Sequence, residues 1–224
     1  MTLKNTPLNL IFLLVLVLLI ELWALKAQSI CRPKYGCDLA LASYYVADDD
    51  EEATNLTHIS HLFSLQIPQI LKFNPNLQKN PNSPNDSIPV PPRTRVRVPF
   101  TCDCLNEDFL GHTFAYTARH GDTYRRIAQR FFANLTTEDW VGRMNLLVPT
   151  DLPDGVRINV TVNCSCGDGH VSRDYGLFLT YPIRNGEGLA EVAAENGVPA
   201  EVIRRYNVES NFSAGLVYVP AKGL

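Results

Sequence analysis

The residues of this 224-residue chain best suited to chemistry are six cysteines. They are Cys31, Cys37, Cys102, Cys104, Cys164 and Cys166. Cysteines bind zinc or form disulfides, but no histidine accompanies them at zinc-ligand spacing. In an extended Cys-X-Cys segment both side chains leave the same face, so each needs a distant partner. We therefore predict disulfides and no metal site, while the residues alone leave the pairing open.

Groups suited to catalysis are sparse. The five histidines are scattered, and no Gly-X-Ser-X-Gly motif occurs. Glu138 and Asp139 form the nearest carboxylate pair for glycoside hydrolysis. They lie in the expected first turn of a helix, where acidic residues are favoured by the helix dipole. We interpret the chain as a binding protein without a cofactor, and not as an enzyme.

The N-terminus predicts a cleaved signal peptide over residues 1–28. Lys4 precedes an apolar run from Leu8 to Ile20, and small residues follow. Because this run is shorter than the ~20 residues that span a bilayer, a membrane anchor is the weaker interpretation. We expect no other spanning segment before Leu224. The net charge of −3 offers no broad basic surface for nucleic acid.

Asn-X-Ser/Thr sequons also indicate a protein of the secretory pathway. Six are present, at Asn55, Asn85, Asn134, Asn159, Asn163 and Asn211. Such sequons accept N-glycans in the secretory pathway. The sequence therefore predicts a glycoprotein whose cysteines are oxidised.

Three similar segments position these residues. "TRVRVPFTCDC" (94–104) and "VRINVTVNCSC" (156–166) are alternating strands that end in Cys-X-Cys. "LVYVPA" (216–221) closes the chain without cysteines. A strand and two short helices precede each of the three. The sequence thus predicts an α+β fold of three tandem βααβ units.

The middle unit carries the clearest helix signals. Residues 123–132 place five apolar side chains on one face, namely Tyr124, Ile127, Ala128, Phe131 and Phe132. Asp122 or Thr123 is the expected N-cap of this helix. A second helix begins in the segment 136–139, where Thr136 and Asp139 have capping-box spacing. An asparagine follows the second helix of each unit (Asn74, Asn145 and Asn207), and we predict a left-handed C-cap there.

Taken together, these features resemble the ectodomain of a plant lysin-motif (LysM) receptor-like kinase, of the chitin elicitor receptor or Nod factor entry receptor type. The resemblance covers residues 31–224. Its most specific segments are "CDLALASYY", "FLGHTFAYTA", "ANLTT", "VNCSCG" and "DYGLFLTYPIR". It implies the disulfides Cys31–Cys104, Cys37–Cys166 and Cys102–Cys164. It also implies a LysM1 unit with spacer (29–104), a LysM2 unit with spacer (105–166) and a LysM3 unit (167–224).

Three segments depart from the family pattern. An acidic run (48–52) and a loop rich in proline and asparagine (74–92) lie in the first unit. The loop is either a solvated connection or a loop for ligand specificity. In the third unit, Asn185-Gly186-Glu187-Gly188 stands where the middle unit has Gly-Asp-Thr. This turn lacks the Asp-Thr pair, so we expect it to matter little for ligand binding.

The resemblance implies a site for N-acetylglucosamine oligomers between two loops of the middle unit. The candidate contacts are Arg119, His120, Gly121, Asp122, Thr123, Val148, Pro149, Thr150, Asp151 and Leu152. Free N–H groups at a helix start and small apolar residues suit the amides and methyls of such a ligand. Helix capping explains Asp122 and Thr123 equally well.

The biological role implied is plant immune or symbiotic signalling at the extracellular face of the plasma membrane. The ligand would be chitin or a lipochitin oligosaccharide, and binding would promote homo- or heterodimerisation with another LysM receptor. A receptor would continue beyond Leu224 into a transmembrane helix and a serine/threonine kinase. The remaining alternative is a secreted, kinase-free decoy or scavenger.

Overall fold

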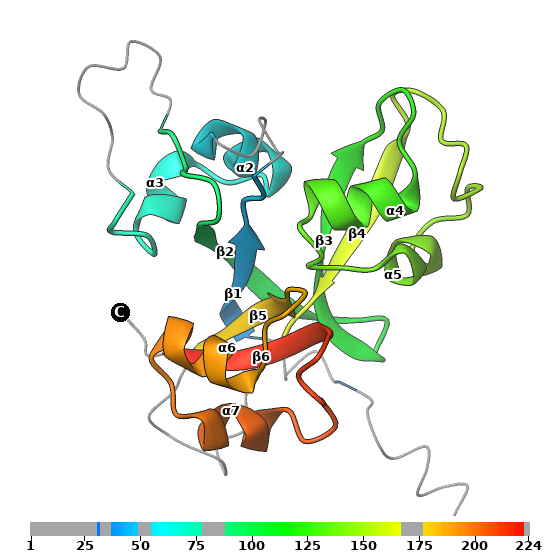
Figure 1. Cartoon of the computed structure of the whole chain (residues 1–224). Coiled ribbons are helices and arrows are strands. Elements are labelled where there is room, and N and C mark those ends of the chain that lie inside the picture. Colours follow the sequence, from blue (N-terminus) through cyan, green and yellow to red (C-terminus); the bar gives the residue numbers. More distant parts are fainter. Residues whose placement is uncertain (1–30, 32–36, 49–54, 78–87, 167–176, 222–224) are drawn as a thin grey trace, which may run out of the picture.

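The computed structural model describes residue 31 and residues 37–48, 55–77, 88–166 and 177–221, and it has three helical pairs around a central sheet (Figure 1). The expected signal peptide, Asn85, most of the acidic run and part of the proline-rich loop lie outside these residues. Among the described helices, none combines the length and apolar content required to cross a bilayer.

Three βααβ units are present, which confirms the predicted α+β fold. Unit 1 consists of β1 (Cys37–Tyr45), α2 (Leu56–Leu62), α3 (Ile67–Leu71) and β2 (Arg95–Leu105). Unit 2 consists of β3 (Phe109–Thr117), α4 (Tyr124–Arg126), η2 (Ile127–Phe131), α5 (Glu138–Arg143) and β4 (Arg157–Asn163). Unit 3 consists of β5 (Leu177–Ile183), α6 (Leu189–Asn196), α7 (Ala200–Tyr206) and β6 (Gly215–Ala221). The boundaries expected at 104 and 166 stay predictions.

The strands form one sheet in the order β4-β3-β2-β1-β5-β6. Strand β2 belongs to two ladders, because its first part pairs with β1 and its last three residues, Asp103 to Leu105, pair with β3. Unit 3 joins the sheet through a short parallel pairing of β5 with β1, at Leu41–Leu179 and Ala42–Thr180.

The apolar interior is divided in two. Units 1 and 2 share one core, in which the ring of Phe63 from unit 1 lies 5.0 Å from that of Phe114 from unit 2. Unit 3 has its own core, to which Leu41 of β1 also contributes. Units 1 and 2 are therefore one packed body, and unit 3 is attached to its edge.

A buried arginine strengthens that attachment. Arg95 on β2 is 7% exposed at its side chain, and it donates to the Pro182 carbonyl at 3.0 Å and to Glu187 at 3.1 Å. Its guanidinium also lies 3.7 Å from the centre of the Tyr181 ring. Burial lowers the pKa of Arg95, although the neighbouring Glu187 and Glu195 act in the opposite direction. This cluster joins unit 1 to unit 3.

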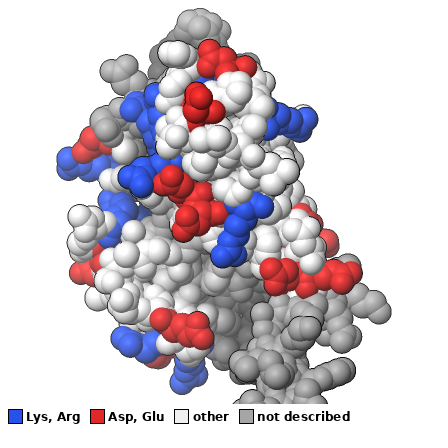
Figure 2. All heavy atoms as spheres, turned by 90° about the vertical axis from the view of Figure 1, so that its right-hand side faces the viewer, with Lys and Arg blue, Asp and Glu red and all other residues white. Residues whose placement is uncertain are grey.

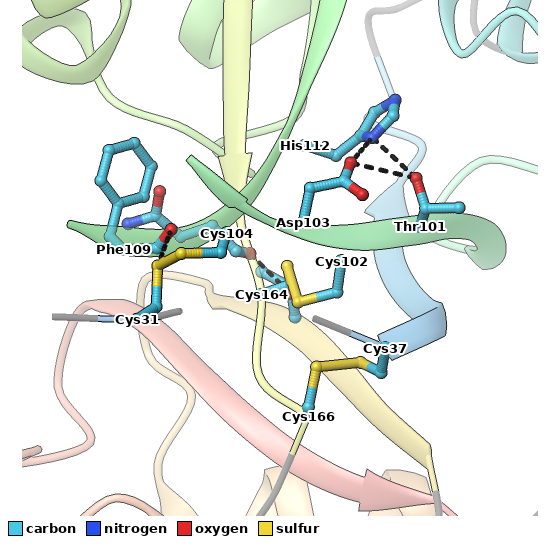
Figure 3. Close-up of a disulfide and its surroundings, with 12 residues drawn as sticks. Cys31, Cys37, Thr101, Cys102, Asp103, Cys104, Phe109, His112, Cys164 and Cys166 are labelled. Carbon is cyan, nitrogen blue, oxygen red and sulfur yellow. Dashed lines mark hydrogen bonds and ion pairs between the residues drawn. A yellow bond between two sulfur atoms is a disulfide. The ribbon is translucent and has the colours of Figure 1, made fainter. Parts of the chain in front are cut away.

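Three disulfides gather where the units meet (Figure 3). They join Cys31 to Cys104, Cys37 to Cys166 and Cys102 to Cys164, the pairs that the family resemblance implied. Sulfur atoms of Cys37, Cys102 and Cys166 lie within 4.8 Å of one another, but each is bonded in a disulfide. A disulfide sulfur is not a thiolate, so this grouping offers no zinc ligands.

The first helix of unit 2 forms at the expected place but with a different winding. After α4, the backbone widens into the π-helical turn η2, and Phe132 N–H donates to the Ile127 oxygen at 3.0 Å. The wider turn directs two adjacent rings into the core. Phe131 stacks on Tyr116, and Phe132 packs edge-on against Phe63. The apolar face predicted for this helix is buried as expected.

The asparagines after the second helices are not left-handed, so the C-cap prediction is wrong. Described non-glycine residues with positive φ include none of Asn74, Asn145 and Asn207. Instead, the amide of each donates to the carbonyl four residues earlier and to a carbonyl of the unit's last strand. Each amide oxygen also accepts an N–H from that strand. We call this arrangement the asparagine clamp.

Candidate functional site

The two loops predicted to bind ligand lie side by side in unit 2. Tyr124 N–H donates to the Pro149 carbonyl at 3.0 Å, and the Tyr124 hydroxyl donates to the Leu147 carbonyl at 3.2 Å. Tyr124 is only 1% exposed. It therefore fixes the start of the first helix against the second loop, a role that its place in the apolar helix face did not reveal.

Asp122 is buried below the first loop, with 2% of its surface exposed. One oxygen of its carboxylate accepts from the Tyr116 hydroxyl at 2.7 Å and from the Arg119 N–H at 2.8 Å. Burial raises the pKa of Tyr116, and its hydrogen bond to Asp122 acts in the same direction. Asp122 thus holds the loop in shape from within, and it presents almost no surface to a ligand.

Thr123, and not Asp122, is the helix N-cap, since its hydroxyl accepts from the Arg126 N–H at 3.1 Å. The loop's outer surface is formed by Arg119, His120 and Gly121, which are exposed. Gly121 has φ of +77°, a left-handed conformation that disfavours other residues. The tip of the turn therefore requires glycine for a backbone reason.

The second loop presents an apolar surface beside the first. Val148 is 62% exposed, and Pro149, Thr150 and Asp151 are also exposed. Leu152 is 6% exposed and packs in the core of units 1 and 2, so it anchors the loop. Of the ten predicted contacts, the structure brings the exposed ones together and puts Asp122 and Leu152 beneath them.

The ten predicted contacts leave out Leu146 and Leu147, although both belong to the apolar loop segment "LLVPTDL" (146–152). Leu146 is fully exposed and Leu147 is 37% exposed. Both directly follow Asn145, whose clamp ends the helix and turns the chain outward. The position of two leucines after a helix-ending asparagine was the signal for an exposed apolar surface, because this position lies away from the core.

The turn of unit 3 resembles the turn of unit 2 in its internal hydrogen bonds. Glu187 is buried, and it accepts from the Arg184 N–H at 2.7 Å. The Tyr181 hydroxyl lies 3.2 Å from Glu187 and 2.6 Å from Glu195, so these two carboxylates share its single hydrogen. These donors stand six and three residues before Glu187, as Tyr116 and Arg119 stand before Asp122. Glu187 therefore holds its turn in shape through hydrogen bonds, as Asp122 does in unit 2.

Glu187 also receives two cations, Arg95 and Arg184. Burial favours the neutral carboxyl, but hydrogen bonds from Arg184 and the charge of Arg95 outweigh it and hold the pKa of Glu187 below its ordinary value. Glu187 is thus paired inside the protein, whereas Arg184, Asn185 and Gly186 of the same turn are exposed.

The face formed largely by unit 2 carries charges of both signs (Figure 2). Basic and acidic side chains are interspersed there, and large uncharged areas lie between them. At the two loops, His120 and Asp154 lie 3.7 Å apart and are both mostly exposed. An uncharged ligand that offers amides, methyls and hydroxyls fits such a surface better than a polyanion.

The described sequons differ in their surroundings. Asn134, Asn159 and Asn211 are exposed, whereas Asn55 caps α2 through its side chain and Asn163 is partly buried. Glycosylation at each of them stays a prediction, and the exposed three offer the most room for a glycan.

Comparison with known proteins gives consistent similarities. A family model described as "LysM domain" matches residues 179–220. The chain is 41% identical to chitin elicitor receptor kinase 1 of Arabidopsis thaliana and 37% identical to LysM domain receptor-like kinase 3 of Medicago truncatula, over 92% and 94% of its length. It spans only 33% of either protein. A crystal structure of the ectodomain of a receptor-like kinase superposes with a TM-score of 0.73 at 39% identity, covering 85% of this chain and 94% of the other.

Proposed function

Because this chain belongs to the LysM receptor-like kinase family and corresponds to the ectodomain of its members, we propose that it binds N-acetylglucosamine oligomers outside the cell. The corresponding region of these proteins is a binding module and not the kinase domain. The relative named chitin elicitor receptor kinase supports the ligand class. In a full-length receptor, binding at the extracellular face of the plasma membrane would be followed by kinase signalling in immunity or symbiosis.

The observation that carries this proposal is the pairing of the two loops of unit 2 through Tyr124 and Pro149. It creates a surface whose floor is apolar at Val148 and Pro149 and whose edge carries polar groups at Arg119, His120 and Thr150. An N-acetylglucosamine chain presents methyls to the former and amides and hydroxyls to the latter. Asp122 and Leu152 support this surface and do not contact the ligand.

Calorimetry with chitin hexamer tests the assignment. We expect Pro149→Trp to weaken binding at least ~10-fold, about 1.4 kcal/mol, with no change in melting temperature, because the side chain is exposed. Val208→Trp is the matched control, since Val208 is 81% exposed and follows the asparagine clamp of unit 3. If Pro149→Trp binds like the wild type while Val208→Trp fails, unit 2 is not the site.

A lipid-modified oligomer is the second candidate ligand, favoured by the exposed Leu146, Leu147 and Val148 beside the loops. An acyl chain on these side chains would remove apolar surface from water. Under this alternative, an acylated chitin pentamer binds more tightly than the bare pentamer, and Leu146→Ser abolishes only that difference. Equal affinities for the two ligands would leave unsubstituted chitin as the ligand.

We further propose that a long oligomer brings two receptors together, as homodimers or with another LysM receptor. An oligomer bound to the exposed residues of this surface would keep its other side open to a second ectodomain. Sedimentation of the chain with chitin octamer and with chitin tetramer tests this. Dimers are expected with the octamer only, and a monomer in both mixtures would contradict ligand-driven association.

A further inference from the structure

A groove separates unit 2 from unit 3, on a different part of the protein from the paired loops. It has a volume of about 860 Å³. Thr136 and Thr137 line it from unit 2, Arg184 and Glu191 line it from unit 3, and Tyr45 of unit 1 contributes to its lining. We call it the interunit groove. A smaller hollow of about 270 Å³ adjoins it and shares Tyr45 and Arg184.

Asn134 lies at the junction of these two hollows, because it lines both. It follows the π-helical turn η2, and Ala133 and Asn134 have φ of +49° and +62°. This left-handed pair ends the helix and leaves Asn134 exposed. Asn134 is also the acceptor residue of the sequon Asn134-Leu135-Thr136.

The third residue of the same sequon, Thr136, also lies on the wall of the groove. Thr136 is 3% exposed and lines the interunit groove, yet its Oγ1 has no hydrogen-bond partner among the described residues. A buried hydroxyl without a partner is unfavourable, so native proteins normally supply one. Because this oxygen exposes less than 1 Å² of surface, it is enclosed and does not face an occupant of the groove.

We propose that the N-glycan carried by Asn134 lies in the interunit groove and links unit 2 to unit 3. The inner sugars of such a glycan are uncharged and rich in hydroxyl and acetamido groups. They would pair with the exposed Thr137 on one wall and with Arg184 and Glu191 on the other. A groove of this size lies within the ~300–1,000 Å³ range of pockets that hold drug-sized ligands, so a short branch of the glycan fits.

An attached glycan suits the groove better than a free saccharide does. Asn134 is itself part of the lining, so a glycan on it starts inside the groove at a high effective concentration. The same glycan would exclude a free saccharide. Its consequence is mechanical: a group that contacts both walls restricts the movement of unit 3 relative to unit 2.

Two measurements on the secreted glycoprotein test the proposal. Glycopeptide mass spectrometry first determines whether Asn134 is occupied. Hydrogen exchange then compares the wild type with Asn134→Gln in peptides that cover 183–191 and 213–217. We expect exchange there to be faster in the variant by roughly fivefold or more, since the amides lose a covering group. Asn159→Gln is the matched control, because Asn159 is an exposed sequon residue on β4 outside the lining of the groove.

Enzymatic removal of glycans from the folded wild type separates loss of the glycan from any effect of the substitution. The digested protein should exchange as fast as Asn134→Gln in the same two peptides. An unoccupied Asn134 overturns the proposal. So does an occupied Asn134 whose removal leaves the exchange of both peptides unchanged, because such a glycan would point into solvent.

Discussion

The side chain of Asn145 is hydrogen-bonded to the backbone of Asn159 in both directions. Its Nδ2 donates to the Asn159 carbonyl at 2.8 Å, and its Oδ1 accepts from the Asn159 N–H at 2.9 Å. The loop that begins after Asn145 is therefore held against β4 at its first residue. Asn207 holds Tyr218 in the same manner in unit 3.

The two clamps allow the effect of a substitution on stability to be separated from its effect on ligand binding. Asn145→Ala and Asn207→Ala should each lower the free energy of unfolding by about 1–3 kcal/mol, because strand groups lose their partners. Only Asn145→Ala should also weaken chitin binding, since only that clamp positions a binding loop. Urea denaturation and calorimetry on both variants measure the two effects. Equal losses of binding in both variants would mean that the clamp of unit 2 has no special role.

The buried carboxylate of Asp122 gives a second prediction. Asp122→Ala leaves the Tyr116 hydroxyl and the Arg119 N–H without their acceptor, and it should cost about 2–4 kcal/mol of stability and most of the binding. Both donors share one carboxylate oxygen, so Asp122→Asn keeps an acceptor for them and should restore stability and affinity. A variant Asp122→Asn that folds normally but does not bind would show that the charge itself contacts the ligand.

Glu187 predicts how stability depends on pH. Its pKa in the folded protein lies below the ordinary value of 4.5. A carboxylate of this kind stabilises the fold fully above its unfolded pKa, and the contribution is lost as pH falls through the folded pKa. Wild type should therefore exceed Glu187→Gln in stability at about pH 6, and the difference should shrink towards about pH 3. Urea titrations at both pH values test this, and a difference that grows in acid would contradict the assignment.

The disulfides permit a comparison at nearly constant loop length. Cys31–Cys104 spans 73 residues and Cys102–Cys164 spans 62, so loss of either bridge should release a similar chain entropy. Cys102 and Cys164 are buried in the core shared by units 1 and 2, whereas Cys31 and Cys104 are partly exposed. Replacing the pair Cys102 and Cys164 by alanine should cost about 2–5 kcal/mol and exceed the loss for the outer pair. Denaturation of the two double variants measures the difference, and an equal loss would show that burial does not matter.

Local signals in the sequence were sufficient for the repeated strands and the helix face, and they limited the N-cap to Asp122 or Thr123, because each feature depends on neighbours within one turn or one strand. Two features depended on contacts that no local pattern contains. Asn145 bonds to a strand 14 residues away, so a C-cap expectation drawn from helix ends alone was wrong. Glu187 has in unit 3 the position that Asp122 has in unit 2, since both turns contain a glycine with positive φ and a 3.0 Å backbone hydrogen bond from the acidic residue to the residue three before it. Its contact with Arg95, 92 residues away, is the part that no local pattern contains.

The candidate site was likewise predicted only in part from the sequence. Its two loops were expected to be neighbours from the order of the elements, and Tyr124 and Pro149 join them. Tertiary packing decides which of the ten residues are exposed and which are buried. For this reason Asp122 and Leu152 were predicted as contacts although they lie inside, and Leu146 was not predicted although it is fully exposed.

The division of β2 between two ladders bears on how such receptors diversify. A chimaera that exchanges unit 2 alone would pair the end of β2 with a foreign β3 and rebuild half of a shared core. Exchange of unit 3 would leave that shared core intact, and it would interrupt the short contact of β1 with β5, the contacts of Arg95 and the packing of Leu41 against unit 3. The repeats visible in the sequence are thus not equally transplantable, and recombination between relatives should preserve units 1 and 2 as one inherited block.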